Sequence, residues 1–280
     1  INGGFILNSV YAGGLVANVN KTKVNITGGY VNNSVFAGAE GNNKDITLVS
    51  GNKTVNMLNG TVGNLYGGSY TSLDKAYSFV NITGGTILSN VFGSGYFGNM
   101  DGNCYIYIGE NAVLNAPHNT ENTDKNTNNI NALHIKGNIY AGANWGTYTG
   151  TFGEHTITGE SNIFIDGKGY NMEENISDNF MVIEGSIYGC GTSCYAGIED
   201  NSIIIRNYGQ MSTGNYISRF LYSIQQCRSL NIDASSIIFE GQTDIASTQN
   251  LNNANNSTLE VIEKNSQTTP QQNTTATDEK

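Results

Sequence analysis

Short runs of alternating or continuous apolar residues recur along the chain, and each run covers only a few positions. Residues 105–108, 162–165 and 202–205 are examples, and most of their positions carry β-branched or aromatic side chains. Runs of this kind predict β-strands of about 3 to 6 residues. Apolar residues at helical spacing persist for no more than about a turn or two. The pattern therefore predicts an all-β protein.

A glycine-rich phrase separates these runs and returns several times. It begins with Gly-Gly, any residue and an apolar residue. A few positions later it continues with an apolar, an aromatic and a small residue followed by Gly. Its aromatic residues are Tyr11, Phe36, Tyr66, Phe92, Tyr140 and Tyr188. The first four are roughly 25 to 30 residues apart, which is a spacing typical of solenoid repeats.

The last two intervals between these aromatics are nearly twice as long as the others, and each contains a polar stretch, at 115–131 and at 170–179. Two explanations are open. Either one coil carries a looped-out insertion in each interval, or two coils lie between successive phrases.

Stacking is the way in which such short repeats bury their apolar side chains, because each strand pairs with its equivalent in the coils above and below. Equivalent residues then lie over one another. The predicted inward ladder consists of Val10, Val35, Leu65, Val91, Ile139 and Ile187. The aromatic next to each is expected to point the other way or to lie over a turn. The glycine pairs are expected where the chain bends with positive φ, and Asn is expected to form ladders between coils.

The fold class that follows is an all-β, right-handed parallel β-helix (β-solenoid) with a disordered C-terminal tail. The right hand is chosen because parallel crossovers are overwhelmingly right-handed. An antiparallel sandwich or a propeller is the rival architecture, since both also use short strands with regular turns. The predicted repeat domain covers residues 1–246, and residues 247–280 form a low-complexity polar tail or linker. Within that tail, the apolar residues 259–262 either cap the last coil or stay solvated.

Residues 82–87 and 91–95, with the sequences Ile-Thr-Gly-Gly-Thr-Ile and Val-Phe-Gly-Ser-Gly, resemble a known type of repeat. They are similar to the Gly-Gly-Thr-Val and Val-Tyr-Gly-Gly-Gly phrases of large adhesin-like surface proteins in gut bacteria and archaea. The resemblance covers about residues 1–245. It implies a right-handed parallel β-helix of the pectate-lyase-like kind, and it carries over no catalytic residue.

Charge narrows the function classes. The 280-residue chain has a formal net charge of −10, and only 13% of its residues are charged. Nucleic-acid binding is not expected, because neutralising the phosphates needs clustered Lys or Arg residues. Membrane insertion is not expected, because no apolar run approaches the roughly 20 residues of a membrane span. The chain opens inside a repeat, so we expect a fragment of a longer protein, and a monomeric one.

Carboxylates are the candidates for catalysis if the domain cuts polysaccharides. Coil stacking can bring Asp166, Glu184 and Asp200 to one face, near the ends of successive strands. Acid–base glycoside hydrolysis needs two carboxylates within about 5 to 10 Å. The competing interpretation is that these are solvated turn residues. A second possible set is Glu40, Asp74 and Asp101. The histidines His118, His134 and His155 are scattered, so neither a metal nor a cofactor is expected.

The cysteines allow more than one interpretation. Cys190 pairs with Cys194 across a turn, or one of them pairs with Cys227 one coil later, or all of them are small buried ladder residues. Trp145 and Tyr148 are the candidates for ligand binding, because glycines surround them. The regular aromatic series is expected to be a core ladder, although on an exposed face it would form a platform for sugars.

The leading hypothesis is a non-catalytic, adhesin-like repeat domain of a secreted or cell-surface protein, which serves as a stalk or as a binding surface. Its expected partners are glycans or host surface molecules, and its expected location is extracellular. The alternatives are a carbohydrate-active β-helix, either a hydrolase or a lyase, and a glycan-binding module.

Overall fold

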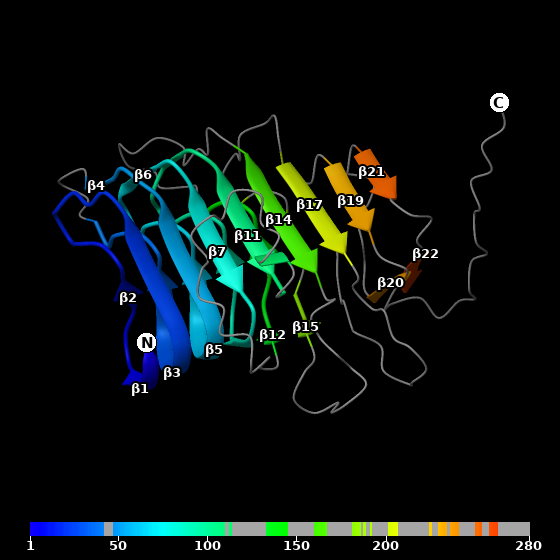
Figure 1. Cartoon of the computed structure of the whole chain (residues 1–280), viewed down its shortest axis with the longest axis horizontal. Helices are drawn as coiled ribbons and strands as arrows, with labels where there is room; N and C mark the ends of the chain where they lie inside the picture. Colours follow the sequence, from blue (N-terminus) through cyan, green and yellow to red (C-terminus); the bar gives the residue numbers. More distant parts are fainter. Residues whose placement is uncertain are drawn as a thin grey trace.

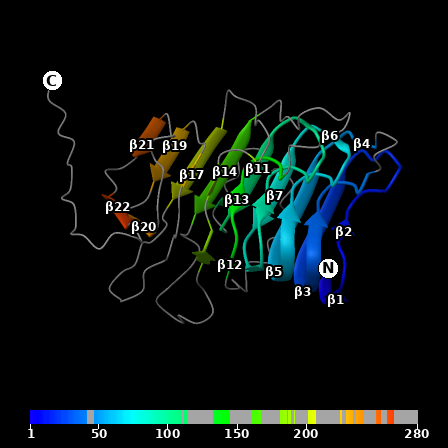
Figure 2. The ribbon, with the colours of Figure 1, turned by 180° about the vertical axis from the view of Figure 1, so that it is seen from behind.

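The computed structural model is a parallel β-solenoid in which one coil of the chain stacks on the next (Figure 1). Every named element is a strand, which confirms the all-β prediction. The view from behind shows the same stacking order along the long axis (Figure 2). The structure describes residues 1–41, 47–109, 112–113, 133–144, 160–166, 181–185, 187–188, 191, 201–206, 224–225, 229–233, 236–240, 250–253 and 258–262.

Three rows of strands, here called faces A, B and C, surround the main core. Strands β3 (Thr22–Phe36) and β5 (Lys53–Tyr66) each run through all three faces. Face A continues with β7 (Ser78–Ile82), β11 (Cys104–Ile108), β14 (Ser161–Asp166), β17 (Asn201–Arg206), β19 (Ser229–Asp233) and β21 (Asn250–Asn253). Face B contains β1 (Asn2–Ile6), β8 (Gly85–Ile87), β12 (Leu133–Ile135) and β15 (Met181–Ile183).

Face C contains β2 (Val10–Tyr11), β9 (Val91–Phe92), β13 (Ile139–Tyr140), β16 (Ile187–Tyr188) and β18 (Ile224–Gln225). A fourth row, face D, consists of β4 (Leu48–Val49), β6 (Leu73–Lys75) and β10 (Met100–Asp101). A separate pair joins β20 (Ser236–Glu240) to β22 (Thr258–Ile262). All of these pairings are parallel, so the antiparallel sandwich and the propeller are excluded.

The predicted inward ladder is confirmed. On face C, Val10 pairs with Val35, and the same register continues through the rest of the predicted set: Leu65, Val91, Ile139 and Ile187. From Val35 onward these side chains have no solvent-exposed area. They join inward-pointing apolar residues of faces A and B in one continuous core. The expected stacking of equivalent residues is therefore what closes the interior.

The glycine at the second position of each Gly-Gly or Asn-Gly pair turns the chain between faces A and B. Gly29, Gly60 and Gly85 stack on one another, and their φ angles are +84°, +93° and +92°. A Cβ atom on Gly60 would lie 2.9 Å from the backbone of the coil below it. Both the left-handed conformation and the close approach require glycine, which confirms the predicted role of the phrase.

The long intervals in the repeat contain one coil each. Strand β11 pairs directly with β14, and β14 pairs directly with β17. Likewise, β12 pairs with β8 on one side and with β15 on the other. No further coil therefore lies between them. In the first long interval the additional residues lie between β11 and β12. In the second they are divided between the stretch before β14 and the stretch from β14 to β15, so the insertion explanation is correct.

Described strands continue past the expected domain boundary at residue 246. Strand β21 pairs with β19 on face A, and the apolar residues 259–262 belong to β22. Residues 263–280 lie outside the described part of the chain. The right-handed sense and the division into 1–246 and 247–280 stay predictions.

Truncation of the face C ladder should destabilise the fold strongly. Leu65→Ala removes a side chain with no exposed area, so it should lower the free energy of unfolding by about 2–5 kcal/mol. Urea unfolding measures the change. Leu15 is 53% exposed, and Leu15→Ala serves as the control, with an expected effect within about 0.5 kcal/mol. Equal losses in the two variants would contradict the ladder.

Candidate functional site

The aromatic residues of the repeat phrase form a second ladder on the outer side of face C. Each ring stacks on its equivalent in the next coil, with centroids 4.5–4.9 Å apart and planes within 5–11° of parallel. We call this set the aromatic ladder: Tyr11, Phe36, Tyr66, Phe92, Tyr140 and Tyr188. Its four inner rings are 0–9% exposed. The expected core ladder is therefore present, but it lies outside the main core and needs its own cover.

Loops that follow face C supply part of that cover, and they stack from coil to coil like the strands. In the loops after Phe36, Tyr66, Phe92 and Tyr140, the residue four positions after the aromatic occupies the equivalent place. The amide of Tyr70 donates to the carbonyl of Ala39 at 2.9 Å, and the amide of Tyr96 donates to Ser69 at 2.9 Å. The amide of Asn144 donates to Gly95 at 3.1 Å. We call the resulting set the loop column: Glu40, Tyr70, Tyr96 and Asn144.

Tyr70 and Tyr96 form an outer layer of aromatic rings above the ladder. Their rings stack with centroids 5.1 Å apart and planes 17° from parallel. Each stands edge-on to a ladder ring, with Tyr70 at 5.7 Å from Phe36 and Tyr96 at 6.0 Å from Tyr66. Phe97 packs at a steep angle against both. Tyr70, Tyr96 and Phe97 are half-buried, so part of each ring reaches solvent.

Oxygen and amide groups accompany these rings. Burial raises the pKa of Tyr11 and of Tyr70, and the nearby Glu40 carboxylate raises both further. Glu40 stands in register with Tyr70, because the amides of Tyr70 and Thr71 donate to the carbonyls of Ala39 and Glu40, each at 2.9 Å. Asn144 Nδ2 donates a hydrogen bond of 2.9 Å to Tyr66 Oη. The loop column thus combines flat apolar rings with groups that form hydrogen bonds, which is an arrangement suited to a ligand with both properties.

A buried carboxylate holds the loop of Tyr70 in place. Asp74 accepts hydrogen bonds from Ser69 N at 2.7 Å and from Ser69 Oγ at 2.6 Å. Ser69 Oγ in turn accepts a bond of 2.8 Å from the amide of Ala39 in the preceding coil. Ser69 directly precedes Tyr70, so this chain of bonds fixes the position of the outer ring.

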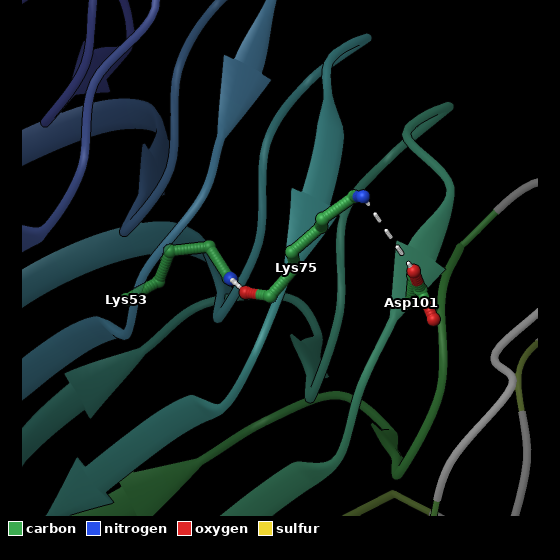
Figure 3. Close-up of polar contacts among 3 residues, drawn as sticks. All are labelled: Lys53, Lys75 and Asp101. Atoms are coloured by element: carbon green, nitrogen blue, oxygen red, sulfur yellow. Dashed lines mark hydrogen bonds and ion pairs between the residues drawn. The ribbon is translucent and has the colours of Figure 1, made fainter.

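Lys53 is the countercharge of Asp74 and has no exposed area. Its Nζ donates to the carbonyl of Lys75 at 2.5 Å (Figure 3). It also donates to the carbonyl of Gly51 at 3.2 Å. Burial raises the pKa of Asp74, and the positive charge of Lys53 opposes the rise. Burial also lowers the pKa of Lys53. The hydrogen bond from Lys53 to the carbonyl of Lys75 links face A to face D.

The candidate catalytic residues are only partly within the described residues. Glu184 follows β15 on face B, where its carboxylate contacts Nε2 of His134 from the preceding coil. Asp166 ends β14 on face A, in register with Arg206 of β17. Asp200 lies outside the described residues, as do Trp145, Tyr148, Cys190, Cys194 and Cys227. The convergence of the three carboxylates, the aromatic site and the disulfide stay predictions.

The second set of carboxylates does not form one site. Asp74 points inward, whereas Asp101 is paired in register with Lys75 and is exposed. Lys75 Nζ lies 4.0 Å from Asp101 Oδ2 on the surface (Figure 3). Glu40 belongs to the loop column. The three acidic residues, each of which follows a copy of the glycine-rich phrase, therefore have three different environments.

The part of the chain that the structure describes contains neither a metal site nor a membrane span of the following kinds. There, no group of three or more His, Cys, Asp or Glu side chains is placed to hold a metal ion. Helices with the length and apolar character needed to cross a membrane are likewise not found among these residues.

Tyr70 and Tyr96 are the residues that sequence reasoning missed. They lie outside the glycine-rich phrase, so its period does not point to them. A signal was nevertheless present, because both occupy the fourth position after a ladder aromatic, where Glu40 and Asn144 also stand. Trp145, the residue singled out from sequence, directly follows Asn144.

Comparisons with known proteins supply no relative: no protein-family model, curated protein or solved structure matches this chain. The parallel solenoid is shown by the strand pairings alone. The likeness to adhesin-like proteins rests on the repeat phrases.

Removal of Lys53 should cost far more stability than removal of a surface lysine. Lys53→Met removes a buried ammonium that donates to the carbonyls of Gly51 and Lys75 and offsets the charge of Asp74, so the free energy of unfolding should fall by about 1–3 kcal/mol in urea. The double variant Lys53→Met with Asp74→Asn removes both charges and should recover much of the loss. Lys75→Met, whose side chain is 47% exposed, should cost less than about 1 kcal/mol. Additive losses in the double variant would contradict the pairing.

High pH should unfold the protein through its buried tyrosines. Burial raises the pKa of Tyr66 well above its usual value, so the folded state keeps a proton that the unfolded state releases above about pH 10. The stability linked to Tyr66 is full below that pH and is lost as the pH rises toward the raised pKa. Between pH 9 and 11, the midpoint of urea unfolding should fall less steeply with rising pH in Tyr66→Phe than in the wild type. Identical slopes would show that Tyr66 is not responsible.

Proposed function

We propose that this chain is a non-catalytic structural repeat domain of a secreted or cell-surface protein, which serves as a stalk and presents a binding surface. The observation that carries the proposal is the unbroken register of face C, from Val10 to Ile224. A stack of this kind is quasi-one-dimensional, because each coil contacts mainly its neighbours. Its length then depends on the number of coils, as a spacer requires.

Polar side chains on the outer side of face A also serve the stacking, and two of them, Asn56 and Asn81, are buried. Asn56 Nδ2 donates to Asn25 Oδ1 at 2.8 Å, and Asn81 Nδ2 donates to Asn56 Oδ1 at 2.7 Å. Between faces B and C, the backbone amide of Asn138 donates to Asn90 Oδ1 at 2.8 Å. These asparagine ladders, expected from the sequence, hold coil to coil. Polar groups that stabilise the repeat itself support a scaffold role.

Two described carboxylates among the enzyme candidates already have partners. Glu184 contacts His134, and Asp74 is buried against Ser69. Their engagement supports the non-catalytic proposal over the carbohydrate-active one. The low share of charged residues and the resemblance of residues 82–95 to adhesin-like repeats support a place outside the cell. The proposed partners are glycans or host surface molecules.

A tandem duplication of residues 22–103 tests the spacer role. Thr22, Lys53, Ser78 and Cys104 are in register, so the duplication adds three whole coils. Small-angle X-ray scattering should show a particle about 14 Å longer with an unchanged cross-section, because coils are about 4.8 Å apart.

A duplication of residues 22–98 is the control, because it ends inside a coil and breaks the register. It should misfold or aggregate. A compact rather than elongated particle from the in-register duplication would contradict the spacer role. Release of reducing ends or unsaturated sugars from polysaccharides by the intact chain would contradict the non-catalytic part of the proposal.

A further inference from the structure

We propose that the loop column binds a neutral glycan, with Tyr70 and Tyr96 against the apolar face of a sugar ring and Glu40 accepting hydrogen bonds from its hydroxyl groups. The inference rests on the proposed function and deepens it, since it names the ligand class and the binding residues. It also differs from the sequence expectation, which placed ligand binding at Trp145 and Tyr148.

The rings of the loop column are held rigidly from behind. Tyr70 stands edge-on to Phe36 and Tyr96 stands edge-on to Tyr66, and both ladder rings are 2% exposed. The bonds from Ser69 to Asp74 fix the backbone next to Tyr70. Rings that are already ordered lose little conformational entropy when a ligand settles on them. Tyrosine also supplies a large contact area and a polar hydroxyl in one side chain.

The polar groups beside the rings match a hydroxyl-rich ligand. Glu40, whose carboxylate only accepts hydrogen bonds when ionised, occupies the loop position in register with Tyr70, as the bonds from Tyr70 N to Ala39 and from Thr71 N to Glu40 show. Sugar hydroxyls both donate and accept, so they complement a carboxylate and phenols together. A sugar ring also carries an apolar face of C–H groups, which pairs with an aromatic ring.

Charge selects the kind of glycan. The loop column contains one carboxylate and no cationic residue, and the whole chain has a net charge of −10. An anionic sugar chain would be repelled by the net negative charge, and none of the four residues of the loop column is a Lys or Arg that could pair with it. The ligand class is therefore a neutral oligosaccharide or polysaccharide.

A quaternary ammonium ion is the other ligand that favours tyrosines beside a carboxylate. Such an ion needs a space between ring faces. Here the rings contact one another, with Tyr70 and Tyr96 stacked and Phe97 only 4.4 Å from Tyr96 in an edge-on contact. The rings present an outer surface and not an enclosed cage, which favours the sugar.

Affinity electrophoresis in native gels tests the proposal with the full chain. The gels contain a soluble β-glucan, a galactomannan or a xylan, with polygalacturonate as the anionic comparison. At least one neutral polysaccharide should retard the wild type. Tyr70→Ala and Tyr96→Ala should each lower the association constant measured from the retardation about tenfold, because the loss of one aromatic contact changes affinity by about that factor. Glu40→Gln should weaken it severalfold, and Tyr70→Phe should retain most of the binding.

Tyr77→Ala is the matched control, because this tyrosine is 39% exposed and packs against Phe79, away from the loop column. It should bind like the wild type. Urea unfolding of each variant shows that lost binding does not reflect lost folding. No retardation by any neutral gel, unchanged retardation of a folded Tyr70→Ala/Tyr96→Ala double variant, or retardation by polygalacturonate alone would overturn the proposal. Binding of tetramethylammonium without retardation by neutral gels would also overturn it.

The two proposals fail separately. If the coil duplication lengthens the particle while neutral gels leave the wild type unretarded, the spacer stands and the glycan site is wrong. If neutral gels retard the wild type and the duplication collapses, the binding site stands and the spacer is wrong.

Discussion

In-register parallel pairing between successive coils is the constraint on which the rest of this structure depends. Once one strand of a coil pairs with its equivalent, every neighbouring residue is also placed over its equivalent. Valine then stacks on leucine, as at Val35 and Leu65, and tyrosine stacks on phenylalanine, as at Tyr66 and Phe92. The main core, the aromatic ladder and the loop column are three outcomes of this one register.

The same constraint accounts for the scarcity of charged residues. A side chain that repeats at equivalent positions meets its own kind at about 4.8 Å, and like charges at that distance repel. Asparagine avoids the penalty because its amide donates to one neighbour and accepts from another. Lys53 illustrates the exception. Its column contains Thr22 and Ser78 on either side, so the charge occurs once and is compensated from face D by Asp74.

The fold could be predicted from the sequence because the repeat phrase itself specifies the stacked positions. The number of coils could not, since spacing along the chain does not distinguish an insertion from an additional coil; the direct pairing of β11 with β14 does. For the candidate site, the sequence indicates only the recurring fourth position after a ladder aromatic. Whether Tyr70 is buried or exposed depends on how its loop stacks on Glu40 and packs on Phe36, and neither contact follows from a local pattern. Asp74 resembled a solvated turn residue for the same reason.

The stretch of chain between β11 and β12 shows how this architecture tolerates change. Its coil is much longer than the preceding one, yet β11 and β12 keep their register with the strands on both sides. The number of residues between β11 and β12 therefore does not affect the packing of the stacked strands. The length of chain at this corner can therefore change during evolution without a change in the stacked strands. A foreign peptide inserted at the same corner would be presented at a defined position along the solenoid axis.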